Sequence, residues 1–292
     1  MHPGPDLPGL PDLPGLPGLP GLPGLPGLPD GISCHGLPAE ENLFPELFES
    51  VRWEEAGKGR RSAVLVRVGA DGAVPLVRTT ARYANPAQRF RPVHERLARR
   101  ISERAGLPAG PDGGGPDGAG FDGAGFDNVL AEVYTNAYTT MGAHSDLALD
   151  LAEGSVIALF SCYRDPDAVR PRKLVFRPKD GVPGAEFEIP LLHHGLVVFS
   201  LAANRRFKHR ILLDPPARAV DNEWLGLTFR TSATPVRHRD GRALLPHGEL
   251  LLATEEQRRE FHRMRRREND ETDFDYPPLA YTVSGSDLLP PC

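Results

Sequence analysis

Hydrophobic and polar residues alternate in short runs over most of the second half of the chain. The runs are rich in β-branched and aromatic residues and end at Pro, Gly or Asp, a pattern typical of strands. Short strands at this spacing favour a sandwich or a jelly roll, so we expect a mainly β fold with flanking helices (α+β). The predicted strands are Val129–Tyr134, Val156–Tyr163, Lys173–Arg177, Glu186–Leu191, Leu196–Leu201, Phe207–Leu213 and Trp224–Thr231.

Helical spacing of hydrophobic residues occurs in three other segments. The pattern predicts helices over Asn42–Trp53, Pro92–Ala105 and Thr254–Asn269, where apolar side chains recur three and four positions apart. Between the first two helices, Ala63–Val68 and Val74–Thr80 are predicted strands. The helices therefore flank the predicted β core on both sides in sequence.

Two low-complexity segments interrupt these patterns. A Gly-Leu-Pro repeat near the start places proline at every third position, which excludes helix and sheet alike, so residues 1–38 are predicted to be a disordered tail. Residues 106–128 are rich in Gly, Pro and Asp and predict a flexible loop. We expect one catalytic domain over residues 40–237 and a helical, polar extension over residues 238–292.

Composition narrows the environment and the partners. The net charge of −5 gives no overall basic field that would call for nucleic acid or an acidic membrane. Cys34, Cys162 and Cys292 are odd in number and far apart, which predicts a reducing compartment, hence the cytoplasm, and no zinc site. No apolar run approaches the ~20 residues of a membrane span, and no signal peptide is visible. The oligomeric state has no signature in the sequence.

A histidine and a carboxylate follow the first of the predicted strands. His144 and Asp146 are two positions apart, and residues so spaced in extended backbone point to the same side. A second histidine, His209, lies inside the predicted strand Phe207–Leu213. Two histidines and one carboxylate form the facial triad of non-haem Fe(II) oxygenases, so we predict that these three residues hold one metal ion.

His193 and His194 are alternative candidates for the second histidine ligand. They precede Gly195 at the start of a predicted strand, where a solvent-facing pair is the more common outcome. His209 fits better because it lies within a strand, on the side opposite Lys208 and Arg210. The preference for it rests mainly on the family resemblance described below.

The last predicted strand has one apolar and one mixed face. Leu225, Leu227 and Phe229 alternate onto one face, and Arg230 lies on the other. A buried arginine on such a face needs an anionic partner, and a dicarboxylate cosubstrate would be one.

These motifs resemble the AlkB-like branch of the Fe(II)/2-oxoglutarate-dependent dioxygenases. The resemblance rests on Met141-Gly-Ala-His144-Ser-Asp146, His209-Arg-Ile and Leu227-Thr-Phe-Arg230, and covers roughly Asn42 to Thr234. It implies a double-stranded β-helix (jelly roll), Fe(II) held by His144, Asp146 and His209, and O2 and 2-oxoglutarate as cosubstrates. Arg230 would bind a 2-oxoglutarate carboxylate and Tyr134 would add a hydrogen bond. Two positions depart from the family: Glu132 replaces its usual Asn, and Trp224 replaces its second Arg.

The predicted activity is oxidation of a C–H bond in a small molecule, with succinate and CO2 as coproducts. Net acidity, the glycine-rich residues 106–128 and the lack of an aromatic and basic cluster beside the motif favour a small molecule over nucleic acid. The alternatives are an AlkB-type demethylase of nucleic acid or protein and a non-enzymatic jelly-roll binding module. Nucleic acid would be favoured if the arginine-rich segments 89–104 and 258–267 folded onto the rim of the iron site.

Overall fold

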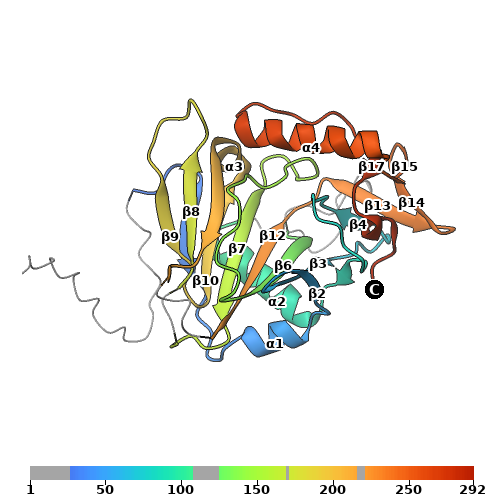
Figure 1. Cartoon of the computed structure of the whole chain (residues 1–292). Coiled ribbons are helices and arrows are strands. Elements are labelled where there is room, and N and C mark those ends of the chain that lie inside the picture. The colour runs from blue at the N-terminus through green and yellow to red at the C-terminus, as the bar shows by residue number, and fades with distance from the viewer. Residues whose placement is uncertain (1–26, 108–124, 169–170, 216–220) are drawn as a thin grey trace, which may run out of the picture.

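A large, mostly antiparallel sheet forms the central layer of the computed structural model, which describes residues 27–107, 125–168, 171–215 and 221–292 (Figure 1). Within these residues the strand order is β1-β10-β7-β12-β6-β3-β2, with β5 beside β3. The strands are β1 (Ile32–Gly36), β2 (Glu54–Gly57), β3 (Arg60–Val66), β5 (Gln88–Arg89), β6 (Asn128–Thr135), β7 (Val156–Tyr163), β10 (Gly195–Ser200) and β12 (Glu223–Arg230).

Three smaller sheets and the helices surround this main sheet. The first small sheet contains β8 (Lys173–Pro178), β9 (Phe187–Pro190) and β11 (Phe207–Leu212). The second contains β4 (Val74–Leu76), β13 (Thr234–Arg239), β14 (Arg242–Leu245) and β15 (Gly248–Glu249), and the third pairs β16 (Leu251–Leu252) with β17 (Tyr281–Thr282). The helices are α1 (Phe44–Glu49), α2 (Pro92–Arg104), α3 (Leu201–Arg206), α4 (Glu255–Asp270) and the short 3-10 helix η2 (Gly285–Leu288).

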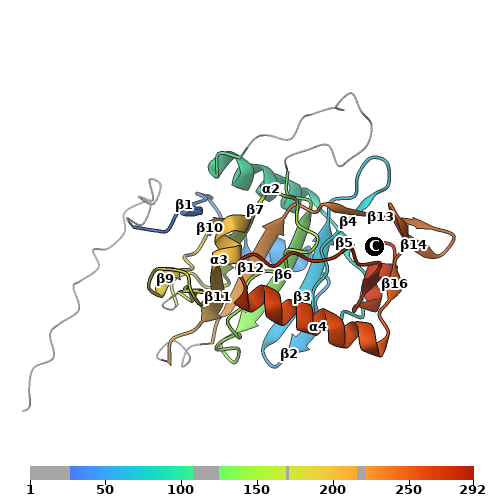
Figure 2. The same cartoon turned by 90° about the horizontal axis from the view of Figure 1, so that it is seen from above.

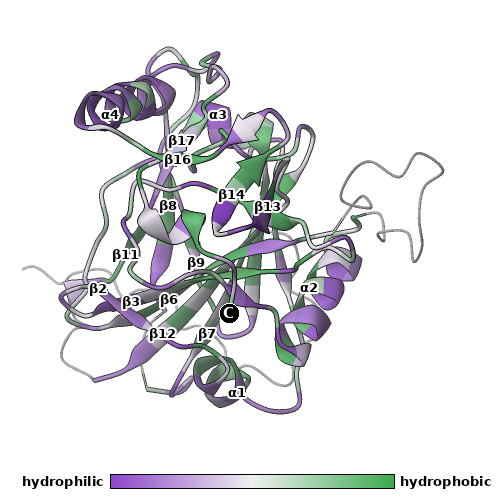
Figure 3. Ribbon diagram, turned by 90° about the vertical axis from the view of Figure 1, so that its right-hand side faces the viewer, coloured by the Kyte–Doolittle hydropathy of each residue, from purple (hydrophilic) through white to green (hydrophobic). Residues whose placement is uncertain are grey.

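The two faces of the main sheet pack against different partners. One face buries a hydrophobic cluster against α1 and α2, whereas the other packs against the sheet of β8, β9 and β11. Figure 2 shows α2 and α4 on opposite sides of the main sheet. Hydrophobic residues are concentrated in the sheets, and α4 is mostly hydrophilic in Figure 3. The space between the two sheets is where the candidate site lies.

The predicted mainly β architecture with flanking helices is confirmed by the antiparallel sheets and by the four α-helices in the described residues. Predicted strands from Val129 onward coincide with β6 to β12 within about two residues, and Pro92–Ala105 coincides with α2. The jelly-roll connectivity and the domain boundary at residues 237 and 238 stay predictions. No helix in the described part of the chain is long and apolar enough to cross a membrane.

The predicted disordered tail over residues 1–38 is wrong for its last part. Ile32–Gly36 form β1, which pairs with β10 at the edge of the main sheet. The short Ile-Ser-Cys-His-Gly segment has too little alternation to show a strand by itself, and the neighbouring edge of β10 supplies its hydrogen-bond partners. Residues 1–26 of the tail and residues 108–124 of the predicted loop lie outside the described residues.

Candidate metal centre

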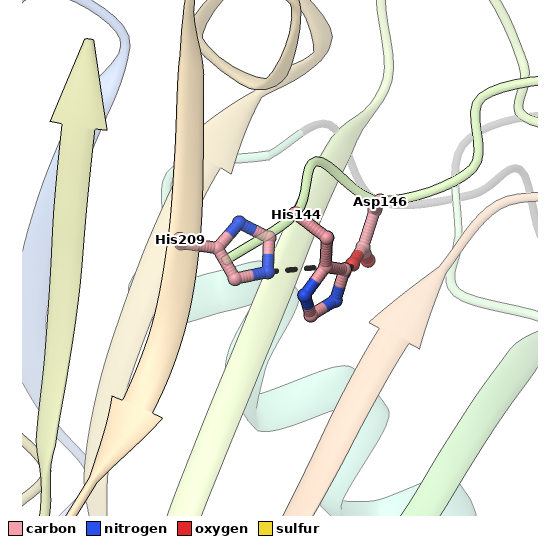
Figure 4. Close-up of side chains that lie close together, drawn as sticks. All are labelled: His144, Asp146 and His209. Carbon is pink, nitrogen blue, oxygen red and sulfur yellow. Dashed lines mark ion pairs between the residues drawn. The ribbon is translucent and has the colours of Figure 1, made fainter. Parts of the chain in front are cut away.

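His144, Asp146 and His209 come together between the two sheets. One ligand atom from each lies within 4.8 Å of the other two, and no other group of His, Cys, Asp and Glu in the described residues has this arrangement. His209 Nε2 is 3.4 Å from Asp146 Oδ1, and His144 Nε2 is 3.9 Å from the same oxygen (Figure 4). The residues that the sequence analysis grouped are therefore neighbours in space.

Backbone pairing sets the two histidines beside each other. His209 is on β11, where buried and partly exposed residues alternate, and its side chain is on the buried side. His144 is in the loop between β6 and β7 and forms a two-hydrogen-bond bridge with His209, at N···O distances of 3.0 and 2.7 Å. The residues around His144 and Asp146 form no strand. The bridge to His209, rather than a strand, therefore holds His144 in place.

The protonation of the site suits a divalent cation. Gly142 O accepts a hydrogen bond from His144 Nδ1 at 2.9 Å, which leaves the lone pair on Nε2 for a ligand. Burial, followed by the neighbouring His209, lowers the pKa of His144 to about 4, so the ring is neutral near pH 7. Metal ligands must be deprotonated, and this imidazole already is.

Arg230 controls the charge of Asp146. Burial opposes ionisation of the carboxyl group, but Arg230 and His209 outweigh it and hold the pKa of Asp146 well below its usual range. Arg230 Nε and Nη2 both donate to Asp146 Oδ2, at 2.9 and 2.6 Å. This edge of the guanidinium is engaged with Asp146, so the predicted bidentate contact with 2-oxoglutarate stays a prediction.

The triad opens into a cavity of about 80 Å³ between the sheets. The apolar part of its wall is formed by Leu130, Met141, Leu159, Leu174, Phe199 and Ile211. Two arginines, Arg60 and Arg230, also line it. Among the described residues, the guanidinium groups of these two arginines are therefore the cations that an anion in this cavity would contact.

Arg60 was not singled out by the sequence analysis. It is on β3, and its Nε and Nη2 both donate to Glu132 Oε1 on β6, at 2.9 and 2.5 Å. Glu132 is buried, and Arg60 is its counter-ion. Glu132 is the position where the resembled family has Asn, so this departure from the family accompanies a second arginine at the cavity wall.

Trp224, the other position that departs from the family, is packed in the core. Its indole lies over Gly226, where an added Cβ would be 2.1 Å from the ring, and its Nε1 donates to Ser161 Oγ at 2.6 Å. Only glycine fits beneath this ring. The position that would carry the second arginine is therefore part of the packed core.

Tyr134 lies in the same packed region. Its ring is fully buried between Tyr138 and Trp224, with ring centroids 4.5 and 4.9 Å away. Its hydroxyl has no hydrogen-bond partner in the described residues, and its side chain is not part of the cavity wall. The predicted hydrogen bond to 2-oxoglutarate stays a prediction.

His193 and His194 do not join the triad. His193 Nδ1 accepts the backbone N–H of Tyr163 at 3.1 Å, and His194 Nε2 accepts that of Leu43 at 3.2 Å. Both therefore serve as hydrogen-bond acceptors at the ends of β7 and α1.

The two arginine-rich segments lie on different sides of the molecule. The segment from Arg89 to Arg104 includes α2, which packs on the face of the main sheet remote from the cavity. The segment from Arg258 to Arg267 is on α4, which contacts the loop of His144 and Asp146 through Arg265. α4 itself carries six arginines and five acidic residues, so it brings a net charge of only +1 to the rim.

Comparison with known proteins gave structural similarity without a sequence match. No family model and no curated protein matches the chain. The solved structure of OsALKBH1 has a TM-score of 0.45 and 13% identity, over 72% of this chain and 100% of that one. A prolyl-4-hydroxylase from Pseudomonas putida has a TM-score of 0.36 and 15% identity, over 70% of this chain and 94% of that one. Because both scores are below 0.5, the function must be argued from the site.

Proposed function

We propose that the protein is an Fe(II)- and 2-oxoglutarate-dependent dioxygenase that oxidises a C–H bond of a small molecule. The observation that carries this proposal is the convergence of His144, Asp146 and His209 on one point beside a cavity. Two imidazoles and one carboxylate, with positions left open, are the donor set of non-haem Fe(II) oxygenases. When bound, iron with 2-oxoglutarate and O2 supplies the oxidation, and succinate and CO2 are the coproducts.

The protein would prepare this donor set before the metal arrives. His144 is neutral and turned by Gly142 so that Nε2 is free, and Arg230 keeps Asp146 ionised. The metal would therefore displace no proton from either residue near pH 7. Removing Arg230 would leave a buried carboxylate without its partner and would weaken the metal site as well as any contact with the cosubstrate.

The cavity also suggests how a dicarboxylate would be anchored. Arg230 and Arg60 each donate Nε and Nη2 to one carboxylate, but Arg230 pairs with a triad residue, Asp146, whereas Arg60 pairs with Glu132, which is outside the triad. We therefore assign the carboxylate remote from the metal ligands to Arg60, with Glu132 holding the guanidinium in place. The apolar residues of the cavity wall would help to exclude water from the bound cosubstrate.

A small molecule remains the preferred substrate class. α2, with its arginines, is on the remote side of the main sheet, and α4 has a net charge of only +1. Nucleic-acid affinity depends mainly on excess Lys and Arg that neutralise phosphates. One observation favours the alternative, a demethylase of nucleic acid or protein: Arg265 of α4 lies against the loop that carries His144 and Asp146.

Succinate formation tests the proposal. The purified protein, incubated with Fe(II), 2-oxoglutarate and a metabolite pool, should release succinate, and His144→Ala should release none. His193→Ala is the matched control, because it removes a histidine that is outside the triad. Methylated oligonucleotides at low salt form the second arm, and turnover there with none in the metabolite pool would favour the demethylase. Equal succinate from wild type and His144→Ala would contradict the proposal.

A further inference from the structure

The loop that carries His144 and Asp146 is held by side chains of α4. Asn269 Oδ1 accepts the backbone N–H of Ser145 at 2.9 Å, and Glu268 Oε1 accepts that of Ala148 at 2.7 Å. Arg265 Nη2 donates to the carbonyl of Ser145. Ser145 lies between the two ligands. Side chains of one helix therefore bind both its backbone N–H and its backbone carbonyl.

The three α4 side chains form one face of that helix. Arg265, Glu268 and Asn269 are spaced i, i+3 and i+4, so they project toward the same loop. Glu268 is buried, and its second oxygen accepts Arg265 at 2.5 Å and the Tyr276 hydroxyl at 2.8 Å. Both oxygens of the buried carboxylate therefore accept hydrogen bonds, which fixes the direction of its contact with the loop.

The same helix also reaches the strand of the third ligand. Lys208, which precedes His209 on β11, forms an ion pair with Asp270 at 2.7 Å. Lys179, at the end of β8, donates to the carbonyls of Glu268 and Glu271 at the C-terminal end of α4, at 2.5 and 3.0 Å. α4 thus connects the loop of His144 and Asp146 with the sheet of His209.

This attachment matters because a metal site demands accurate ligand placement. Ligand distances must be met within about 0.2 Å, and fixing each residue of an irregular loop costs conformational entropy. The loop has no strand of its own between β6 and β7. Asn204 supplies a further fixed point, because its side chain accepts Asp146 N at 2.7 Å and donates to Asp146 O at 2.9 Å.

We infer that α4 is a positioning element of the metal centre, and that docking of α4 and binding of the metal are thermodynamically coupled. Asn269 and Glu268 are positioning residues: they touch no ligand atom but fix the backbone on either side of Asp146. The inference rests on the metal site proposed above. Coupling is reciprocal, so loosening α4 weakens metal binding, and metal binding protects α4.

The test is Mn(II) affinity, measured by calorimetry on the full chain without cosubstrate. Asn269→Ala removes the acceptor of Ser145 N–H and should weaken binding about 10-fold, as outer-shell substitutions do. Asn269→Asp keeps an acceptor oxygen and should retain the affinity. Arg263→Ala is the matched control, because Arg263 is exposed on α4 and pairs only with Glu260 among the described residues. Should Asn269→Ala fold poorly, Glu268→Gln is the second variant: it loses the charge that pairs with Arg265 and should also weaken Mn(II) binding, and unchanged affinity would contradict the positioning role.

Hydrogen exchange supplies the reciprocal measurement. Mn(II) should slow exchange of α4 amides in wild type, and less so in Asn269→Ala. If wild type binds Mn(II) and folded Asn269→Ala binds it equally well, the positioning role is contradicted while the metal site stands. If wild type binds no Mn(II), the metal site and the positioning role both fall.

Discussion

The two faces of β12 show how one strand can serve both stability and chemistry. Leu225, Leu227 and Phe229 are buried in the cluster that packs on α1 and α2. Thr228 and Arg230, which alternate with these residues along the strand, line the cavity together with the triad. Because successive side chains of a strand alternate, the helix-covered face and the cavity face are built from interleaved residues.

The difference lies in what each face does with polar groups. The buried centre of the apolar face depends on volume and shape. The cavity face places two arginine–carboxylate pairs, Arg230–Asp146 and Arg60–Glu132, in a wall that is otherwise mostly apolar. Substitutions on the two faces should therefore separate: those on the apolar face change stability, and those on the cavity face change binding.

Phe229→Ala tests the apolar face and should have the largest effect. The ring is fully buried and contacts Phe126 edge-on, with centroids 5.6 Å apart. Its loss should lower the free energy of unfolding by about 3–5 kcal/mol. Chemical denaturation measures this, and Mn(II) affinity of the folded protein should stay unchanged. A large loss of Mn(II) affinity in a protein that is still folded would break the separation of the faces.

His209→Ala tests the metal centre itself. Removing one of three protein ligands should reduce Mn(II) affinity by more than about 100-fold, beyond the range of outer-shell substitutions. Equilibrium dialysis against Mn(II) measures it, with His194→Ala as control, because His194 accepts a backbone N–H remote from the triad. Retained affinity in His209→Ala would show that another residue is the ligand.

Arg60→Met tests the assignment of the remote carboxylate. With Mn(II) bound, wild type should prefer 2-oxoglutarate over 2-oxobutyrate, which lacks that carboxylate, and Arg60→Met should lose about 10-fold of the preference, or about 1.4 kcal/mol. Calorimetric titration with both acids gives the ratio. The double variant Arg60→Met/Glu132→Gln avoids leaving a buried carboxylate unpaired.

Arg61→Met is the matched control for Arg60. Arg61 is the next residue on β3 and also pairs with a glutamate, Glu223, but its guanidinium lies over the Phe48 ring, 4.9 Å from the centroid, on the helix side. It should leave the preference unchanged. A preference that survives in both Arg60 variants would return the anchoring role to Arg230 or to another group.

His193→Ala should have the smallest effect. Its Nδ1 accepts one backbone hydrogen bond, so the loss should be about 1 kcal/mol or less in the free energy of unfolding. Mn(II) affinity and succinate formation should stay within about 2-fold of wild type, a change of less than 1 kcal/mol. Thermal unfolding and the succinate assay measure the two quantities, and a larger loss of metal affinity would connect this histidine to the site.

Local patterns in the sequence were sufficient to predict the strands and to pair His144 with Asp146, whereas the choice of His209 over His193 and His194 rested mainly on the family resemblance. Alternation located β12 and the buried side of β11, and spacing paired His144 with Asp146. These features depend on residues that are close in sequence, so a local sequence pattern reveals them. The face occupied by His209 followed from the same alternation.

Features that depend on distant segments could not be predicted. Arg60 became a candidate only when β3 was found beside β6, because no local pattern distinguishes it from Arg61. The contacts of Glu268 and Asn269 join residues more than 100 positions apart, and α4 was predicted only as part of an extension. β1 was missed because its partner, β10, lies far along the chain.

The central claim is that one Fe(II) ion binds at His144, Asp146 and His209 and that 2-oxoglutarate binding depends on it. Anaerobic titration of the purified protein with Fe(II), followed by 2-oxoglutarate, tests both statements in one experiment. The account predicts one Fe(II) per chain, 2-oxoglutarate binding only after the metal, and neither in His144→Ala or His209→Ala. Absence of Fe(II) binding in wild type, or equal Fe(II) binding in these variants, would contradict it.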